Sequence, residues 1–550
     1  MTDATVHRQI RAATLLWMGS VLLSRALGFF REVVIARAQG ANASTDVYYA
    51  AFTIPDFLNY LLAGGALSIT FIPIFAAYIA RGEEKEGWKV FSIVTTFLAI
   101  ALGSGIAFAM VFADRLVSWI VPGFNAAQRI ELVHLTRIIL PAQFFLFEGF
   151  LLSAVQMAKG QHRFAVMAPL IYNGGTILGG LLLAPKLGME GFCWGLLAGA
   201  FVGGFLLQYY GARRIGLRWR LDLSFRHPGF IEYLKLTVPV MIGQSLIVWD
   251  EWITRFFASS LVPATISWLS YGRKIALVPQ AVFGNAASVA SYPQLARLAV
   301  EKKLTEMHAT LMKALRGVFA LAMSSQVFLI VLAPEICFLL FRSRKFDDGD
   351  VAATSAVLVL YSLGVAAWCS QAIVARGFYA MRDTLTPTLV GTAMTILSLP
   401  VYRFLGGSFA HRGLAMASTF SVTLLAVCLQ WQFVRKLRGA GGDVSKEPFL
   451  PFLFRLTAAC LVAGSVAYLI RAGMLTLWPD LPVAGTAASR LVLKELAAAR
   501  FPGRLLSRTL VVGVAGGVAL LGAARALKIE EIVGPVRRIV SKLSRSKRSE

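Results

Sequence analysis

Positively charged residues lie inside long apolar stretches of this sequence, where a charge is energetically expensive. Arg25 and Arg31 fall within the first such stretch, and Glu32 directly follows Arg31. Arg273 and Lys274 are adjacent within a later stretch. A guanidinium stays charged and can bind a phosphate through two parallel hydrogen bonds. These cations therefore predict a binding site for an anionic ligand.

The same residues also allow a purely structural interpretation. Arg25 and Glu32 are seven positions apart, so a helix would place them on nearly the same face. Glu32 could then pair with an arginine and only hold helices together. Arg273 and Lys274 could instead extend their side chains to the membrane surface. We favour a binding role for Arg25 and for the 273–274 pair, and both interpretations stay open for Arg31.

Acidic and amide residues within the apolar stretches extend the candidate site. Asp46 stands at the start of the second stretch, and Asn59 follows a predicted break at Pro55. Both are expected to contribute to substrate binding. A carboxylate near the membrane midplane could exchange a proton, although pairing with Arg137 or Arg255 is an equal alternative. The candidates for ion coupling are Glu32, Glu148, Asp250 and Glu251.

The composition identifies the environment in which these residues work. The chain has 550 residues, of which 57% are hydrophobic and 15% charged, with a mean hydropathy of +0.67. A soluble domain carries about a quarter charged residues, and it could not hide so much apolar surface from water. The sequence therefore predicts a polytopic membrane protein. It contains no nucleotide-binding or metal-binding motif, so we expect no cofactor, no metal and no enzymatic activity.

The apolar stretches set the expected number of membrane crossings. A helix needs about 20 apolar residues to span the bilayer, and about fourteen stretches meet this requirement by the hydropathy rule. The second is interrupted at Pro55 and at Gly64-Gly65. The fold is thus expected to be all-α, with spans at residues 13–39, 47–80, 90–113, 133–158, 164–184, 190–211, 231–257, 264–292, 314–340, 351–379, 386–405, 413–435, 449–471 and 507–526.

The distribution of basic residues predicts the orientation. The 54 Lys and Arg residues exceed the 29 Asp and Glu residues, which gives a net charge of +25. With the N-terminus in the cytoplasm, most of these cations fall in cytoplasmic loops, whereas residues 40–45 and 258–265 contain none. This is the positive-inside pattern. It predicts that both termini are cytoplasmic, and it accounts for the charge without a nucleic-acid partner.

Two parts of the sequence repeat a pattern of basic residues, Pro and Gly. Lys159-Gly160, Pro169 and Gly191 correspond to Arg376-Gly377, Pro387 and Gly413, with an offset of about 217 residues. An offset of six spans predicts parallel lobes, as in secondary transporters. The expected domains are an N-terminal lobe at 1–212, a C-terminal lobe at 213–438, two extra helices at 439–526 and a basic cytoplasmic tail at 527–550.

Longer motifs carry a resemblance to a known family. They are SRALGFFREVVIAR at 24–37, Gly40-Ala41, Thr45-Asp46, Ala51-Phe52, IPDFL at 54–58, GGALS at 64–68, FIP at 71–73, the segment 267–279, GFYA at 377–380 and DTLTP at 383–387. In these motifs the chain resembles the MurJ/MviN lipid II flippases of the multidrug/oligosaccharidyl-lipid/polysaccharide exporter superfamily. The resemblance covers the first twelve spans. The last two match in number more than in sequence.

The resemblance implies a fold, a substrate and a location. It implies two six-helix lobes around a central cationic cavity and two further helices that form a groove for the lipid tail. The implied substrate is undecaprenyl-diphosphate-linked disaccharide-pentapeptide, moved from the inner to the outer leaflet of the bacterial cytoplasmic membrane by alternating access. Other cell-wall synthesis proteins are possible partners. Arg25, Arg31, Asp46 and Lys274 match charged positions of the family pattern.

The sequence also departs from the family pattern. An arginine pair of the second span is replaced by Asn59-Tyr60, a glutamate by Gly64, and an acid before Lys274 by Arg273. Further departures are Glu32, Thr254, Ser398 and Tyr402. One phosphate-binding charge is thus missing from the second span, and Arg273 with Lys274 could restore it. Three alternatives stay open: a paralogue that exports another polyprenyl-linked oligosaccharide, a drug/cation antiporter, and a scaffold that transports nothing.

Overall fold

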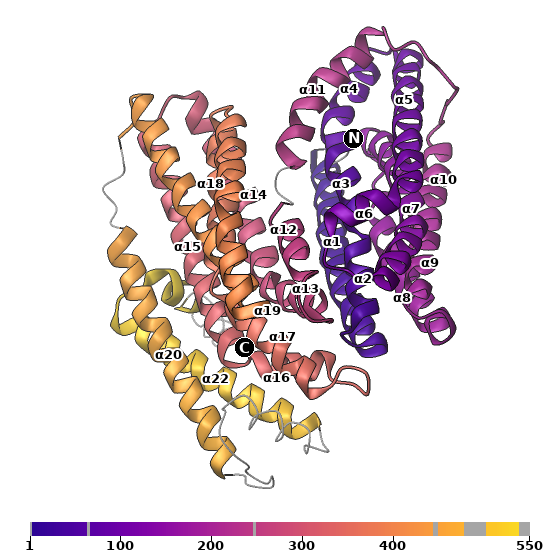
Figure 1. The fold of residues 1–550 in the computed structure, drawn as a ribbon. Coiled ribbons are helices and arrows are strands. Elements are labelled where there is room, and N and C mark those ends of the chain that lie inside the picture. The colour runs from indigo at the N-terminus through magenta and orange to yellow at the C-terminus, as the bar shows by residue number, and fades with distance from the viewer. Residues whose placement is uncertain (1–2, 63–65, 246–248, 444–448, 478–501, 538–550) are drawn as a thin grey trace, which may run out of the picture. The chain divides into compact units, whose positions relative to one another are not determined.

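The described part of the chain is built from α-helices. The computed structural model describes residues 3–62, 66–245, 249–443, 449–477 and 502–537, and these residues contain helices but no strand (Figure 1). Helices suit an apolar environment because each segment satisfies its own backbone hydrogen bonds. The expected all-α class is therefore confirmed. The interruption predicted at Gly64-Gly65 lies outside the described residues.

The chain divides into two compact units, which we call the N-terminal and C-terminal units. The N-terminal unit comprises Met1–Ser267 with Ser343–Phe346, and the C-terminal unit comprises Trp268–Arg342 with Asp347–Glu550. The predicted lobe boundaries at 212 and 438 follow the sequence repeat rather than compactness, and they stay predictions.

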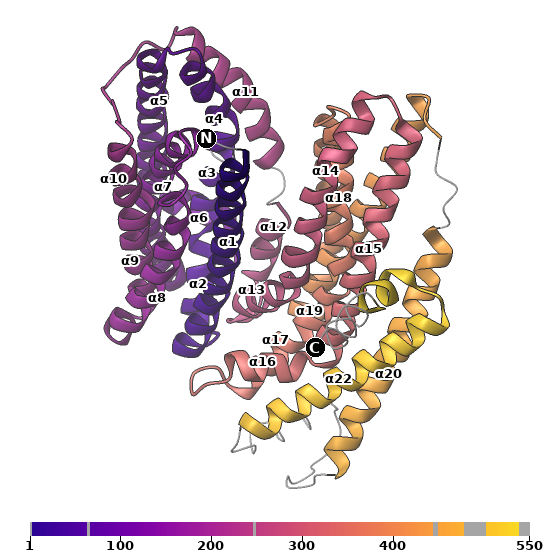
Figure 2. The ribbon, with the colours of Figure 1, turned by 180° about the vertical axis from the view of Figure 1, so that it is seen from behind.

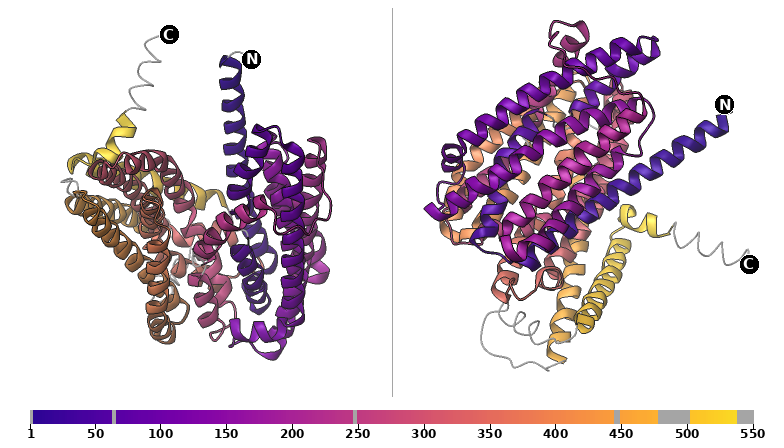
Figure 3. Two further views of the ribbon diagram at one scale, coloured as in Figure 1. Left: turned by 90° about the horizontal axis from the view of Figure 1, so that it is seen from above. Right: turned by 90° about the vertical axis from the view of Figure 1, so that its right-hand side faces the viewer.

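The N-terminal unit is a bundle in which helices run side by side (Figures 1 and 3). Its central helix is α7, which packs against α2, α4, α5 and α9. The helices are α1 (Asp3–Gln39), α2 (Ala43–Ala51), α3 (Thr53–Leu62), α4 (Ala66–Ala80), α5 (Glu84–Val111), α6 (Ala113–Ile120), α7 (Ala126–Ala158), η1 (Ala165–Met167), α8 (Ala168–Leu187), α9 (Met189–Gly199), the π-helical η2 (Ala200–Leu206), α10 (Leu207–Arg214), α11 (Pro228–Ser245) and α12 (Trp249–Ala258).

The C-terminal unit holds the remaining helices, and α20 and α22 lie side by side within it (Figure 2). Helix α13 (Thr265–Ala276) begins in the N-terminal unit and ends in the C-terminal unit. The others are η4 (Gln280–Gly284), α14 (Asn285–Val300), α15 (Leu304–Val331), α16 (Ala333–Phe341), α17 (Asp348–Ser362), α18 (Val365–Ala380), α19 (Leu385–Gly439), α20 (Phe449–Leu477) and α22 (Pro502–Ala526).

Eight helices in the described residues are long and apolar enough to cross a membrane, and the bent pair α17–α18 would make a ninth. Helix α19 has 55 residues, which at 1.5 Å per residue is about twice the thickness of a bilayer. Its backbone breaks at Ala410, where φ is 49°, so the helix fits the two separate runs expected there. Several other expected spans fall on charged or interrupted helices. The total of about fourteen therefore stays a prediction.

The interior of the N-terminal unit explains how its helices approach so closely. Aromatic and aliphatic side chains of α4, α5, α7 and α11 form one buried cluster, which includes Phe71, Phe91 and Phe147. Helices α8 and α9 instead meet through glycine. A Cβ atom on Gly179 would lie 2.3 Å from the Cα of Gly195, so the two backbones touch. Small residues at helix contacts are typical of membrane bundles.

Two adjacent glycines of α8 allow this contact to be tested. A Cβ on Gly175 would lie 2.7 Å from the Cα of Gly199, whereas one on Gly174 would meet no atom within 4 Å. We expect Gly175→Ala to destabilise the protein by about 1–3 kcal/mol through overpacking. Gly174→Ala should be neutral or stabilising by up to about 1 kcal/mol, because alanine favours helix. Thermal unfolding in detergent measures both. Equal effects would contradict a backbone contact at Gly175.

Candidate functional site

Arg31 is held in a polar network that joins α1 to α8 and α2. Its Nη2 lies 2.7 Å from Glu32 Oε1, and its Nη1 donates to Asn173 Oδ1 of α8 at 3.1 Å. The other carboxylate oxygen of Glu32 accepts from Tyr49 Oη at 2.7 Å. Glu32 is buried, but 20% of the Arg31 side chain is exposed. The ion pair therefore orients the guanidinium, while a fifth of the Arg31 side chain stays exposed.

Arg25 occupies a different environment on the same helix. It precedes Arg31 by six residues, or about 9 Å of helical rise, and it is exposed at the residue level. Between the two arginines, a Cβ on Gly28 would lie 3.6 Å from Asn173. This part of α1 therefore lies close to α8. Thus the structure places both arginines on one described helix, and Arg31 shares a network with Glu32 and Asn173.

Arg273 and Lys274 lie half-buried on α13, in the C-terminal unit. The guanidinium of Arg273 lies 6.0 Å from the centre of the Tyr361 ring and 5.7 Å from that of Trp368. Both rings are buried in the protein, so Arg273 packs inward against α17 and α18. An aromatic face attracts a cation by about 0.5–2 kcal/mol. This contact speaks against the alternative that Arg273 reaches the membrane surface.

Asp46 holds the start of the helix that carries these two cations. Its buried carboxylate accepts from the backbone N–H of Ser267 at 2.7 Å and from Ser267 Oγ at 2.5 Å. Ser267 belongs to the first turn of α13, where backbone N–H groups lack helical acceptors. Asp46 is thus a cap supplied from another part of the chain. Asp46 therefore has a structural role, and its contact with substrate stays a prediction.

The candidate acids of α12 differ in their partners. Glu251 accepts from Arg255 Nη2 at 2.5 Å, one helical turn away. Arg255 also donates to Thr53 Oγ1 at 2.9 Å and lies 3.8 Å from Asp56. Pairing with Arg255 was one of the two interpretations of Glu251, and the geometry favours it. Asp250 is half-buried at the beginning of the same helix.

Glu148 has a different environment from Glu32 and Glu251. It is buried in the middle of α7, beside Phe147 of the apolar cluster. Within the residues that the structure describes, its Oε1 has no hydrogen-bond partner. Arg137, the other expected partner, donates from Nε to the backbone oxygen of Met110. A buried carboxyl in such surroundings is costly when ionised and cheaper when protonated, which fits a group that exchanges a proton.

Some residues of the network could not be assigned from sequence. Asn59 is half-buried on α3, whereas Gly64 and the side chain of Tyr60 lie outside the described part. The sequence does not predict that Asn173 accepts from Arg31, that Tyr49 donates to Glu32 or that Asp56 lies beside Arg255. Asp56 belongs to the motif at 54–58, and that motif is the one sequence signal that could have pointed to this residue. No group of His, Cys, Asp and Glu in the described ranges could hold a metal ion.

The capping role of Asp46 leads to a graded prediction. Asp46→Ala leaves a buried N–H and a buried hydroxyl without their acceptor, which should cost about 1–3 kcal/mol of folding free energy. Ser267→Ala removes the hydroxyl alone and keeps the backbone bond, so its cost should be smaller. Thermal unfolding of the two variants and the double variant measures the coupling. Additive effects would contradict a direct interaction between the two side chains.

Comparisons with known proteins identify the family of this chain. The model of the family "MurJ: Lipid II flippase MurJ" matches residues 35–481. A probable lipid II flippase MurJ of Haemophilus influenzae is 30% identical over 472 residues, covering 82% of this chain and 90% of the relative. The corresponding protein of Vibrio cholerae is 29% identical over 437 residues, covering 77% and 83%.

Solved structures support the same fold. A lipid II flippase MurJ in an inward closed conformation superimposes with a TM-score of 0.72 at 20% identity, covering 93% of this chain and 99% of that chain. An inward-facing multidrug resistance MATE family transporter gives a TM-score of 0.64 at 12% identity, covering 76% and 95%. The fold is therefore shared with transporters. From the family match over most of its length, this chain belongs to the MurJ lipid II flippase family.

Proposed function

We propose that this protein is a flippase, and not an enzyme, that moves lipid II from the inner to the outer leaflet of the bacterial cytoplasmic membrane. The family match over residues 35–481 carries the proposal. The relatives from Haemophilus influenzae and Vibrio cholerae are both named as probable lipid II flippases. The substrate class that we propose is therefore that of undecaprenyl-diphosphate-linked peptidoglycan precursors. The distribution of basic residues supports cytoplasmic termini.

Arg25 and Arg31 are the residues that we propose to bind the diphosphate from α1. A diphosphate offers several acceptor oxygens, and guanidinium groups bind such anions in a bidentate manner. Arg31 is fixed by Glu32 and Asn173 but remains partly exposed, so it is oriented before the ligand arrives. This lowers the entropy lost on binding. Arg273 and Lys274 are further candidate contacts on α13, with Asp46 holding the start of that helix.

Asn59 is the proposed determinant of the headgroup preference. The family pattern has an arginine pair where this chain has Asn59-Tyr60, and an amide can bind sugar hydroxyls or peptide groups rather than a phosphate. Native mass spectrometry of the purified protein would identify the polyprenyl diphosphate that co-purifies. A lipid with a different glycan would identify the chain as a paralogue that exports another oligosaccharide.

Loss of an arginine on α1 should reduce transport. Arg25→Gln and Arg31→Gln each remove a charge-assisted contact of about 1.5–3 kcal/mol, so we expect the appearance of lipid II in the outer leaflet to slow by about ten- to a hundredfold. The assay is lipid II accessibility at the outer leaflet in cells depleted of their own flippase. Arg115→Gln, an exposed arginine on α6, is the matched control and should behave as wild type. Normal transport by both α1 variants would refute the proposed site.

Glu148 is the residue that we propose to couple transport to protons. Glu148→Gln keeps the shape of the side chain and removes its ability to ionise. In vesicles with an imposed pH gradient, we expect wild-type transport to respond to the gradient and the variant to transport at a rate independent of it. Glu131→Gln, on the same helix, is the control. A variant that still responds to the gradient would exclude Glu148 as the coupling group.

A further inference from the structure

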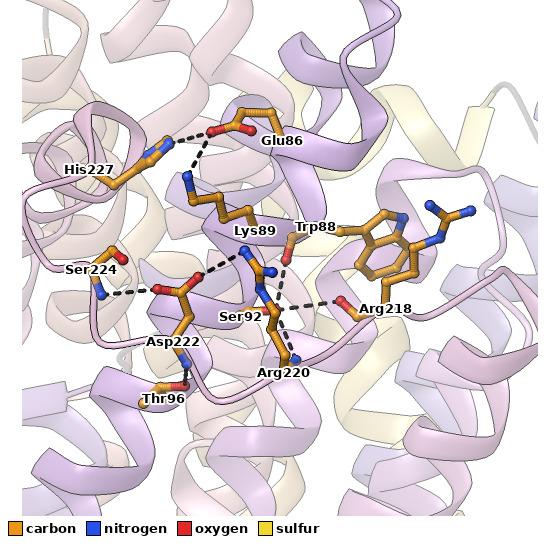
Figure 4. A network of polar contacts seen from close by, with 10 residues as sticks. All are labelled: Glu86, Trp88, Lys89, Ser92, Thr96, Arg218, Arg220, Asp222, Ser224 and His227. Carbon is orange, nitrogen blue, oxygen red and sulfur yellow. Dashed lines mark hydrogen bonds and ion pairs between the residues drawn. The ribbon is translucent and has the colours of Figure 1, made fainter.

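The segment that connects α10 to α11 in the N-terminal unit is extended, and it crosses one face of α5 (Figure 4). Its backbone is bound to two side chains of α5. The N–H of Arg220 donates to Ser92 Oγ at 3.2 Å, and the N–H of Asp222 donates to Thr96 Oγ1 at 3.3 Å. Ser92 and Thr96 are four residues apart, so they lie on one face of the helix. Two backbone N–H groups of the segment are thus bound to α5, and the ring of Phe225 also packs against Phe97 of that helix.

Polar contacts also fix both ends of this segment. Lys159 donates to the backbone oxygen of Ile215 at 2.9 Å and forms an ion pair with Glu84 at the start of α5. At the other end, His227 Nε2 lies 2.7 Å from Glu86 Oε1, and His227 Nδ1 accepts from the N–H of Gly229. The conformation is therefore set before any ligand binds.

The turn within the segment is stabilised by Asp222. Its Oδ1 accepts from the N–H of Ser224 at 3.0 Å, and Arg220 lies 3.4 Å from its other oxygen. The hydrogen bond with Ser224, and to a lesser degree the charge of Arg220, hold the pKa of the Asp222 carboxyl below its usual value. Asp222 therefore stays ionised near neutral pH.

The side chains of residues 217–226 alternate between apolar and polar, and three of the polar positions are arginine. Successive residues of an extended chain point to opposite faces. The apolar set is strongly exposed, since 53% of Trp219, 70% of Leu221 and 56% of Leu223 is accessible. Between them stand Arg218 and Arg220, which are also exposed. Bulky apolar groups beside arginines are typical of segments that lie in a membrane–water interface.

The position of the segment along α5 agrees with a location at the membrane–water interface. Ser92 lies eight residues, or about 12 Å, after the first residue of α5. The predicted apolar run begins at residue 90, close to this level. The backbone of Arg218 and Arg220, which contacts Ser92, thus lies where the hydrocarbon region is expected to begin, and Asp222 lies one helical turn further along α5, at Thr96. At this depth Trp219 and Leu221 can enter the acyl boundary while the guanidinium groups meet lipid phosphates.

We propose that residues 217–226 bind the headgroups of anionic phospholipids in the leaflet next to the start of α5. Arg218 and Arg220 contact the phosphodiester groups, with Arg226 as a third cation, and Trp219 with Leu221 anchors the segment among the acyl chains. The charge pattern of the loops places this leaflet on the cytoplasmic side. The site is separate from the arginines of α1, so it does not depend on the proposed transport function.

The test uses the full-length protein in detergent, titrated with brominated phosphatidylglycerol. The signal is the part of the tryptophan emission that is absent in Trp219→Phe, because bromine quenches nearby indoles. Each cation near an anionic surface contributes about 1 kcal/mol. The double variant Arg218→Gln with Arg220→Gln should therefore bind about 30-fold more weakly.

A matched control removes the same charge from the same end of α5. Arg81 lies in the turn before that helix and Lys85 in its first turn, and both residues are exposed, so the control variant is Arg81→Gln with Lys85→Gln. We expect its affinity to stay within about threefold of wild type. Brominated phosphatidylcholine should bind at least tenfold more weakly than phosphatidylglycerol, and millimolar inorganic phosphate should not displace the lipid.

Four results would overturn the proposal. Unchanged affinity in the 218/220 double variant would show that these arginines bind no lipid. Equal loss in the 81/85 control would show an effect of net charge alone. Equal binding of phosphatidylcholine would exclude selection for an anionic headgroup, and displacement by inorganic phosphate would indicate a site for free anions.

Discussion

The hydrocarbon core of a membrane gives no hydrogen bonds to a charged side chain, so each charge at this depth needs a partner from the protein, a water-filled cavity or a ligand. This constraint separates the arginines of the structure into two kinds. Arg471 donates to Glu335 at 2.6 Å and both side chains are buried, and Arg255 is buried against Thr53 and Glu251. Arg31 has a carboxylate partner but remains one-fifth exposed. Only an arginine of the second kind can exchange part of its contact for a ligand.

The buried ion pairs have a structural role, because they position helices relative to one another. Glu335 belongs to α16 and Arg471 to α20, so their ion pair joins the last described helices to the rest of the C-terminal unit. Removal of one partner of such a pair costs about 3–5 kcal/mol because the other charge is left buried. Helix α20 also packs against α15 and α22. A pair this buried fixes a register between helices that apolar packing alone would leave variable.

The sequence predicts the helices well because hydropathy and Pro/Gly positions are local signals. It predicts α1 and its charges for the same reason. It does not predict that Arg31 meets Asn173 or that Asp46 caps Ser267, since these partners are 142 and 221 residues apart and neither partner stands out by its type. The segment across α5 was also missed, because its bonds use backbone groups and two ordinary hydroxyl side chains. Hydropathy is a weaker signal where a helix is bent or charged, so it predicts the fold class more directly than the number of spans.

The departures from the family pattern become coherent when charge is considered together with its surroundings. Where the pattern resembled here has an arginine pair on the second span, this chain has Asn59-Tyr60, and where it has an acid on α13, this chain has Arg273. A carboxylate at that position would cancel a neighbouring positive charge. The faces of Tyr361 and Trp368 contact the guanidinium of Arg273 and attract its positive charge. The aromatic pair thus lets α13 carry two adjacent cations, so positive charge lost from one helix is regained on another. For an anionic substrate, Arg273 would offset the positive charge that is missing at Asn59-Tyr60, while the shape and hydrogen-bonding groups around the headgroup would change.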